Sequence, residues 1–247
     1  MSEPINVTGM VLSVAPQGEY DRRVVLLTKE RGKISAFARG ARRSSSALLA
    51  ATNVFVMGSF TLYEGRNSYT MTHAAVKEYF TDLAKVQPEV YYGFYFLELA
   101  SYYAREGLEE TAMINLLYIS LKALLGDKID NRLVKAIFEL KTMVINGEYP
   151  QVFACQNCGV SEDLVGISIS RSGIYCQECL NQAGDIKKIS PSALYTLQYI
   201  ISSPLEKLYT FTVTPEVLTE IQNIVDKYRE LYIEKSFKTL EILEMMC

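Results

Sequence analysis

Four cysteines in the second half of the chain form the pattern best suited to chemistry. They are arranged as two Cys-x2-Cys pairs, Cys155 with Cys158 and Cys176 with Cys179, and 17 residues separate the pairs. Each pair places two thiolates on one side of a tight turn, and two pairs supply the four soft ligands that tetrahedral zinc prefers. Because protein fills all four positions, none stays open for water or substrate. We therefore expect one structural Zn²⁺ and no metal-centred reaction.

Two other interpretations of these cysteines are a set of unpaired core thiols and a redox pair. A thioredoxin-type redox motif needs one pair beside a βαβ unit, and the chain predicts no such unit. Two intact pairs at a separation typical of zinc ribbons rarely arise by chance, which favours zinc. A fifth cysteine, Cys247, ends the sequence and is expected to be unpaired, with no assigned role. This cysteine usage is typical of a reducing cytoplasm and not of a secreted disulfide scaffold.

A second group of residues suited to binding is basic and lies near the N-terminus. Residues 38–46 read Ala-Arg-Gly-Ala-Arg-Arg-Ser-Ser-Ser, which places three arginines beside three hydroxyl groups. Guanidinium groups bind phosphate oxygens in bidentate fashion, and hydroxyl and N–H groups add neutral donors. Such a patch predicts salt-sensitive binding of nucleic acid without sequence preference. With the neighbouring basic residues, the candidate patch consists of Arg22, Arg23, Arg31, Lys33, Arg39, Arg42 and Arg43.

The alternative is that these charges form an ordinary solvated face. Arg22 and Arg23 are adjacent in a predicted strand, so their side chains point to opposite faces. The charge distribution nevertheless favours a polyanionic partner: residues 1–80 carry ten Lys and Arg against six Asp and Glu, a net of +4, whereas the remainder carries 15 against 22, a net of −7. The aromatic residues of the predicted strands are expected to fill a core and not to stack on bases. They are Phe37, Phe55, Phe60, Tyr63 and Tyr69.

No arrangement of residues typical of a catalytic site is found. His73 is the single histidine, and it lies in a predicted strand. The sequence contains neither a GxxxxGK[ST] phosphate loop, nor a GxSxG elbow, nor a carboxylate cluster of the two-metal nuclease kind. We therefore interpret the chain as a binding protein and not an enzyme. No apolar run approaches the roughly 18 residues of a membrane span, and no signal peptide is recognised, so a cytoplasmic location without membrane contact is expected.

The elements that must position these residues begin with strands. The chain has 247 residues, 49% of them hydrophobic, which is enough for several small domains with buried cores. Alternating and β-branched residues predict five strands, over 7–14, 22–28, 33–39, 53–63 and 68–76. Gly32 is expected to take positive φ in the turn between the second and third. Five short strands without a long helix between them predict a small closed barrel, and the OB fold has this count.

Helical periodicity follows the barrel. Ser190-Pro191 and Thr214-Pro215 are typical helix starts. The helical stretches are expected near 91–103, 116–125, 133–145 and 217–232, and residues 236–243 either continue the last helix or form a short packed segment. The predicted class is α+β multidomain, with an N-terminal OB-fold β-barrel and a C-terminal all-α domain that carries an inserted four-cysteine zinc module. The predicted domains are 1–78 (barrel), 79–149 and 189–247 (two parts of the helical domain) and 150–188 (zinc module).

Several stretches, in order along the chain, carry a resemblance to a known family. They are residues 8–12, 19–23, 27–33, 38–43 and 232–240. Together with the four cysteines, they resemble the RecO family of bacterial recombination mediators, which act in DNA repair. The resemblance implies an N-terminal OB fold, a helical domain and an embedded zinc module, in agreement with the parts derived above.

The resemblance also implies partners and a role in RecF-pathway recombinational repair, with a place at the bacterial nucleoid. Family members bind single- and double-stranded DNA, anneal complementary strands, work with RecR, and contact the acidic tail of single-stranded DNA-binding protein (SSB). They help to load RecA on SSB-coated DNA, so RecA is an indirect partner. On this chain, DNA contact falls on Arg22, Arg23, Arg39, Arg42 and Arg43, with Arg31 and Lys33 as further candidates. Candidate cations beside a notch for the SSB tail are Lys122, Arg132, Lys135 and Lys141.

Two other functions fit the same residues. One is an OB and zinc-ribbon protein that binds RNA in transcription or translation. The other is an interaction scaffold whose barrel binds no nucleic acid. The arginine-rich loop on an otherwise acidic chain argues against the scaffold, and strand annealing separates all three.

Overall fold

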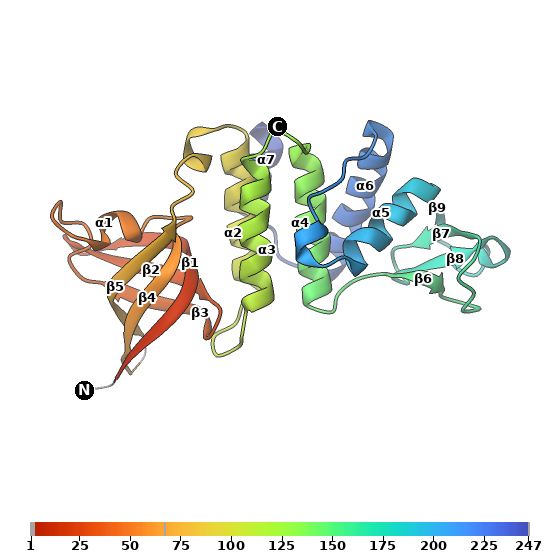
Figure 1. Cartoon of the computed structure of the whole chain (residues 1–247). Coiled ribbons are helices and arrows are strands. Elements are labelled where there is room, and N and C mark those ends of the chain that lie inside the picture. The colour runs from red at the N-terminus through yellow and green to blue at the C-terminus, as the bar shows by residue number, and fades with distance from the viewer. Residues whose placement is uncertain (1–2, 67, 247) are drawn as a thin grey trace. The chain divides into compact units, whose positions relative to one another are not determined.

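The structure, a computed structural model, describes residues 3–66 and 68–246 (Figure 1). Cys247, to which we assigned no role, lies outside the described residues. The chain divides into two compact units. The first runs to residue 121 and takes in the chain from residue 237 onward, and the second is residues 122–236. The finer predicted boundaries at 78, 149 and 188 stay predictions.

Five strands form a closed barrel in the first unit. They are β1 (Pro4–Gln17), β2 (Asp21–Thr28), β3 (Gly32–Ala38), β4 (Met57–Glu64) and β5 (Tyr69–Glu78). Their order around the barrel is β1-β2-β3-β5-β4 (Figure 1), and the pairing of β3 with β5 is parallel while the others are antiparallel. The predicted barrel of OB type is confirmed.

Strand β1 closes the barrel because it pairs with two different strands. Its first half pairs with β4 from Pro4 to Met10, and its second half pairs with β2 from Gly9 to Gln17. The register shifts between Val11 and Ser13, and such a bulge bends a strand where it passes from one partner to the next. The strand is longer than the predicted 7–14, because backbone pairing with β2 continues past the apolar stretch. The barrel interior is filled by buried side chains that include Val7, Val24, Leu26, Ile34, Phe60, Leu62 and Met71.

The loop from β3 to β4 holds a short helix that the sequence did not predict, α1 (Leu48–Ala51). Arg22 ties this loop to β2. Its Nη1 donates to the Leu49 carbonyl at 2.8 Å, to Thr52 Oγ1 at 2.8 Å and to Asn53 Oδ1 at 3.0 Å. The strand that we predicted from residue 53 starts only at Met57, because Arg22, which is distant in sequence, holds Thr52 and Asn53 in the loop.

The turn between β2 and β3 has no room for a side chain. Gly32 has φ of +64°, as expected, and a Cβ atom there would lie 1.9 Å from the Arg105 carbonyl oxygen. That carbonyl accepts from the Lys33 N–H at 3.2 Å, and the Arg31 carbonyl accepts from Gly107 N–H at 3.0 Å. The segment after helix α2 (Glu89–Tyr103) thus lies directly against this turn.

The first unit also contains η1 (Leu83–Lys85), α3 (Thr111–Leu124), whose last three residues belong to the second unit, and α7 (Lys238–Met246). Helix α7 packs on α2. The Phe237 ring meets Tyr95 and Tyr102 edge-on, with centroids 5.9 and 5.7 Å apart, and Glu98 Oε2 accepts from the Thr239 hydroxyl at 2.6 Å. The tail is therefore a separate packed segment and does not continue the preceding helix.

The second unit combines helices with a small sheet. The helices are α4 (Asn131–Ile145), α5 (Pro191–Ser202), η3 (Leu205–Lys207) and α6 (Pro215–Tyr232). The sheet has the order β6-β8-β7-β9, and η2 (Gln177–Cys179) lies between β8 and β9 in the chain. Its strands are β6 (Gln151–Cys155), β7 (Leu164–Ser168), β8 (Gly173–Cys176) and β9 (Lys187–Lys188). The hairpin of β7 and β8 was predicted, whereas β6 and the two-residue β9 were not.

Both predicted helix starts of the second unit are confirmed. Ser190 Oγ accepts from Ala193 N–H at 3.2 Å, and Thr214 Oγ1 accepts from Val217 N–H at 3.5 Å. These side-chain caps satisfy backbone donors that have no partner within the helix. Among the described helices, none is long and apolar enough to cross a membrane.

Two lysines proposed as docking cations are used inside the second unit. The Lys141 ammonium is buried and donates to the carbonyls of Ile200, Ile201 and Ser203 at 3.2, 3.0 and 2.7 Å, which satisfies the end of α5. Burial lowers its pKa. Lys135 Nζ lies 3.0 Å from the buried Glu139 carboxylate and makes a further ion pair with α6. These contacts remove both lysines from the candidates for binding an SSB tail.

We expect Gly32→Ala to destabilise the protein more than Gly18→Ala. Both positions have positive φ, +64° and +60°, so each alanine adds similar backbone strain. Only at position 32 does the new Cβ meet backbone, because nothing lies within 4 Å at Gly18. Urea denaturation should show a loss of about 1 kcal/mol for Gly18→Ala and roughly 3 kcal/mol or more for Gly32→Ala. Equal losses would contradict the packing of the Arg105 segment on this turn.

Candidate metal and nucleic-acid sites

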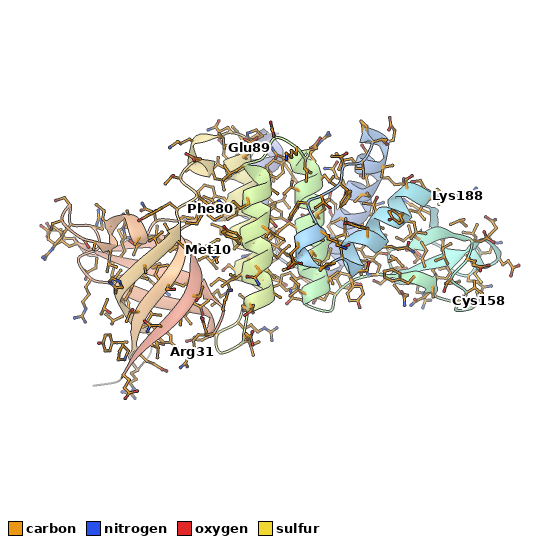
Figure 2. All side chains as sticks on the ribbon, viewed as in Figure 1. Met10, Arg31, Phe80, Glu89, Cys158 and Lys188 are labelled. Carbon is orange, nitrogen blue, oxygen red and sulfur yellow. The ribbon has the colours of Figure 1, made fainter. Side chains whose placement is uncertain are left out.

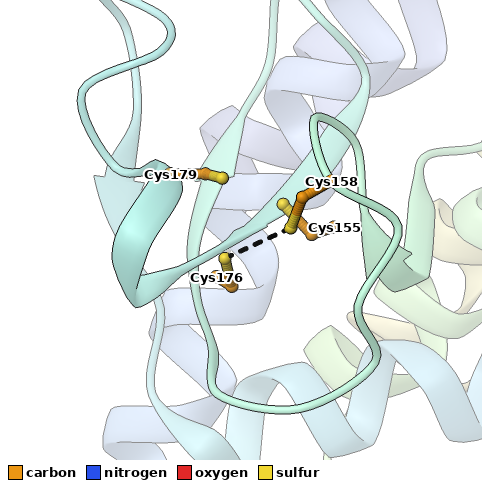
Figure 3. A group of neighbouring side chains, drawn as sticks. All are labelled: Cys155, Cys158, Cys176 and Cys179. Atoms are coloured by element: carbon orange, nitrogen blue, oxygen red, sulfur yellow. Dashed lines mark hydrogen bonds between the residues drawn. The ribbon is translucent and has the colours of Figure 1, made fainter.

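Four thiols meet in the second unit (Figure 3). The Sγ atoms of Cys155, Cys158, Cys176 and Cys179 all lie within 4.8 Å of one another. Cys155 ends β6, Cys158 lies in the turn that follows, Cys176 ends β8 and Cys179 ends η2. Three of the four are buried, and Cys158 is exposed. The two pairs predicted from the sequence therefore converge on one point.

The sulfur positions fit a tetrahedral metal ion. A Zn–S bond of about 2.3 Å places thiolate sulfurs about 3.8 Å apart in a tetrahedron. The Sγ atoms of Cys158 and Cys176 are 3.7 Å apart, too far for a disulfide. Asn157 Nδ2 donates to Cys179 Sγ at 3.3 Å, a contact that orients this ligand and favours its thiolate. The donor set is the soft four-sulfur set of structural metal sites.

The electrostatics of the cluster call for a cation. Burial opposes a charge on Cys155, but backbone N–H donors from Cys158, Cys176 and Asn157 outweigh it and lower the pKa of this thiol to about 6. The Asn157 amide favours the Cys179 thiolate, but burial and the three neighbouring thiols raise the pKa of Cys179 to about 12. One thiolate is therefore favoured and further ones are opposed. A divalent ion would remove this conflict, because it neutralises the charges that repel one another.

The cysteine module is hydrogen-bonded to the helices of its unit. The buried Tyr228 hydroxyl of α6 donates to the Ser168 carbonyl at 3.2 Å, and Gln198 Nε2 of α5 donates to the Val152 carbonyl at 2.7 Å. The hydroxyls of Ser172 and Tyr232 also contact each other. Order in the module is therefore coupled to the positions of α5 and α6.

The basic patch predicted from the sequence divides between two ends of the barrel. Arg22 pairs with Ala38 in the ladder of β2 with β3, so the start of β2 and the loop at 39–43 share one end. Arg31 and Lys33 belong to the β2–β3 turn at the other end, about 20 Å away along the strands. Five of the seven candidates come together and two do not.

The two separated residues have different surroundings. Lys33 Nζ donates to the Ser101 carbonyl at 2.5 Å, near the end of α2, so its ammonium is used within the first unit. Arg31 is exposed at the turn (Figure 2). The sequence analysis placed Arg31 and Lys33 in one patch with the 39–43 loop, and the structure shows that neither residue lies beside that loop.

Within the cluster, Arg22 and Arg42 are engaged in internal bonds. The Arg22 guanidinium holds the α1 loop as described above. Arg42 Nη1 donates to the carbonyls of Gly18 and Glu19 at 3.2 and 3.0 Å, and Arg42 N–H donates to the Tyr20 carbonyl at 2.8 Å. These contacts fix the 39–46 loop against the β1–β2 turn.

The other three arginines of the cluster, Arg23, Arg39 and Arg43, are exposed. The Arg43 guanidinium lies 5.0 Å from the centroid of the Tyr20 ring, which is 44% exposed. Arg23 Nε donates to Ser35 Oγ at 3.0 Å, and the strand register places Arg23 opposite the half-buried Phe37. Cationic and aromatic side chains are thus paired at one end of the barrel.

Tyr20 is a candidate binding residue that the sequence analysis missed. Its only signal was its position in the turn before the Arg22–Arg23 pair. The expectation that aromatic residues fill the core is confirmed for Phe55, Phe60 and Tyr69, which are buried, and is wrong for Tyr63, which is 37% exposed. Phe37 is only half-buried. The structure places His73 on β5 with an exposed side chain.

Two family models and several relatives match this chain, and together they cover most of its length. The family model described as recombination protein O N terminal matches residues 1–80, and the C terminal model matches residues 88–241. The chain is 30% identical over 240 residues to a protein named DNA repair protein RecO from Alkaliphilus metalliredigens, covering 96% of this chain and 98% of that relative. A protein of the same name from Acetivibrio thermocellus is 28% identical over 243 residues, covering 98% and 97%. Since both domain models match in order, the chain belongs to the recombination protein O (RecO) family.

Proposed function

We propose that this chain is a DNA repair and recombination mediator that binds DNA through the loop end of its barrel. The observation that carries the proposal is the grouping of exposed Arg23, Arg39 and Arg43 with Tyr20 and Phe37 on a five-stranded barrel of OB type. Family membership and the names of its relatives, DNA repair protein RecO, support the same role.

The proposed contacts divide by chemistry. Guanidinium groups neutralise phosphates, which gives affinity that falls steeply with salt. Tyr20 and Phe37 offer ring faces on which unpaired bases stack. Arg22 and Arg42 contribute indirectly to DNA binding, because their hydrogen bonds within the protein position the loop that carries Arg39 and Arg43.

Annealing of complementary strands follows from this chemistry without a catalytic group. Two DNA strands repel each other, and cations that screen their phosphates lower this barrier. No bond is made or broken, so the reaction needs no ATP and the chain acts as a binding protein and not an enzyme. Double-stranded DNA is bound through the same phosphate contacts.

The mediator role adds protein partners. A contact with the acidic SSB tail would raise the effective concentration of the protein on coated DNA. Lys122 and Arg132, both exposed, are the cations proposed for that contact, and the Arg132 guanidinium also forms a solvent-exposed ion pair with Asp130. RecR is proposed to join the complex, and RecA to load on the strand that is released, in the bacterial cytoplasm at the nucleoid.

The metal of the four-cysteine site is proposed to be one Zn²⁺ per chain. Cys155, Cys158, Cys176 and Cys179 would hold it, and it would stabilise the fold without touching substrate. The sheet of this module is short, so metal binding is expected to supply on the order of 10 kcal/mol toward its folding.

RNA binding in transcription or translation is the alternative that uses the same residues. Arginine and aromatic contacts alone do not discriminate RNA from DNA, since discrimination depends on contacts to the 2′-hydroxyl. Faster annealing of complementary DNA oligonucleotides without ATP would support the mediator, whereas preferential binding of RNA would support the alternative.

We expect the double variant Arg39→Gln/Arg43→Gln to bind single-stranded DNA more weakly on every sequence. The slope of log affinity against log salt should fall by about 1.4, because each lost phosphate contact on a single strand removes about 0.7. Fluorescence anisotropy with a labelled oligonucleotide over a salt series measures both.

A matched control for that experiment is Arg66→Gln/Arg105→Gln, which removes the same charge from exposed residues outside the 39–46 loop. Its slope should stay close to that of the wild type. If the two double variants behave alike, the loop end of the barrel is not the DNA site.

We expect Cys176→Ser to reduce bound zinc from about one ion per chain to nearly none. The second unit should lose order around its sheet, while the barrel keeps its strands, because the cluster involves only residues 155–179. Elemental analysis and hydrogen exchange resolved along the chain measure the two effects. Ser161→Ala, at an exposed position between the cysteine pairs, is the control. A metal-free module that stays protected from exchange would refute the structural role of zinc.

A further inference from the structure

Three lysines line a cavity of the second unit that the function proposed above does not use. The cavity has a volume of about 570 Å³ and lies between strands β7 and β9 and helix α6. Lys187 and Lys188 come from β9, where Lys188 is labelled in Figure 2, and Lys227 comes from α6. In the described part of the chain, none of the three ammonium groups takes part in an ion pair.

The two acidic residues of the same cavity are already bonded within the protein. Asp185 accepts from the Ser168 hydroxyl at 2.5 Å and from the Ser170 N–H at 2.9 Å. Glu220 accepts from the Ser190 N–H at 2.8 Å and from its hydroxyl at 2.6 Å. These carboxylates are held by internal donors, and three lysines against two carboxylates give the lining a net charge of +1, which favours an anionic ligand.

An aromatic groove continues along the same stripe of α6. Val217, Glu220, Ile224 and Lys227 follow one another at three- and four-residue steps, so they share one face of the helix. Val217 lines the groove, of about 820 Å³, and Glu220 to Lys227 line the lysine cavity. The cationic and aromatic parts are therefore neighbours on one surface of this unit.

Three aromatic rings and several hydroxyl groups line this second groove, and among the described residues that line it none carries a charge. The Tyr195 ring, 67% exposed, lies 6.4 Å from Tyr199, whose ring meets Phe211 at 5.0 Å. Phe211 and Tyr199 support one another edge-on, whereas Tyr195 keeps most of its surface toward solvent. An exposed, supported ring beside a set of cations is the arrangement that holds an unpaired base next to its phosphate.

We propose that this face of the second unit binds a single strand of nucleic acid, with phosphates on Lys187, Lys188 and Lys227 and a base on Tyr195. The identification of that strand as DNA rests on the proposed function. With one strand on the barrel and another here, the two units of the chain would hold the two polyanions that annealing must bring together. An acidic peptide would place its carboxylates on the lysines and its apolar side chains in the same groove, and the experiments below separate it from a nucleic acid strand.

The test uses the full chain and a fluorescent 20-nucleotide oligo-dT. Lys187→Gln/Lys188→Gln/Lys227→Gln should lower the salt slope of binding by about 2, since three phosphate contacts on a single strand are worth about 0.7 each. The control Lys85→Gln/Lys128→Gln/Lys238→Gln removes the same charge from exposed lysines that line neither groove. If the two triple variants have equal slopes, the inference is wrong.

Tyr195→Ala tests the base contact separately and leaves every charge in place. It should weaken binding of the oligo-dT about tenfold and leave binding of a duplex of equal length unchanged, since paired bases offer no free face. An unchanged melting temperature would show that the exposed ring is not needed for folding. A lysine effect without any Tyr195 effect would also overturn the inference, because it would show phosphate contacts without a bound base.

The outcome is separable from that of the barrel site. If the Arg39 and Arg43 variant loses affinity and the lysine variant does not, the barrel carries the DNA and this inference alone fails. If the lysine variant loses slope and the arginine variant does not, the barrel proposal fails and the second-unit site stands.

Discussion

The first unit depends on one strand that hydrogen-bonds to two neighbours. Because β1 bends at the bulge between Val11 and Ser13, it joins β4 at one edge of the sheet and β2 at the other, and no edge remains open. Closure sets the position of every strand end. It brings the β1–β2 turn, the start of β2 and the loop after β3 to one end of the barrel, which is where the exposed arginines and Tyr20 meet. The proposed DNA contact is thus a consequence of barrel topology as much as of charge.

A different constraint governs the second unit, because its small sheet is not stabilised by the burial of apolar side chains alone. Instead of a larger apolar core, this module has four converging thiols that could hold a metal ion. Hydrogen bonds from Tyr228 and Gln198 connect the module to α6 and α5. The cluster brings β6 and β8 together, and β9 completes the same sheet. Strand β9, which carries two of the lysines of the proposed second site, pairs with β7 in the same sheet. A metal ion held by the four thiols would therefore stabilise the sheet on which these lysines stand.

Basic residues serve two purposes in this protein, and only their surroundings tell them apart. Arg22, Arg42 and Lys141 donate to backbone carbonyls and hold loops or a helix end in place. Arg39 and Lys188 are exposed, and in the described structure their side chains donate no hydrogen bond to a backbone carbonyl. The number of positive charges in the sequence does not distinguish between these two kinds of basic residue. The division matters for function, because loss of the first kind would disturb the fold, while loss of the second would remove a ligand contact.

Sequence alone determined the four-cysteine cluster, the five strands of the barrel, the helix starts at Ser190 and Thr214, and the arginine-rich loop. These features are local: a cysteine spacing, an alternation, a cap or a run of like residues is legible in a few neighbouring positions. Tertiary structure decided what depends on contacts between distant residues. It turned the loop before β4 into a helix held by Arg22, took Lys33 away from the patch to the end of α2, and placed Tyr20 beside Arg43. The physical reason is that a side chain's role follows from the donors, rings and carbonyls around it, and those are assembled only when the chain folds.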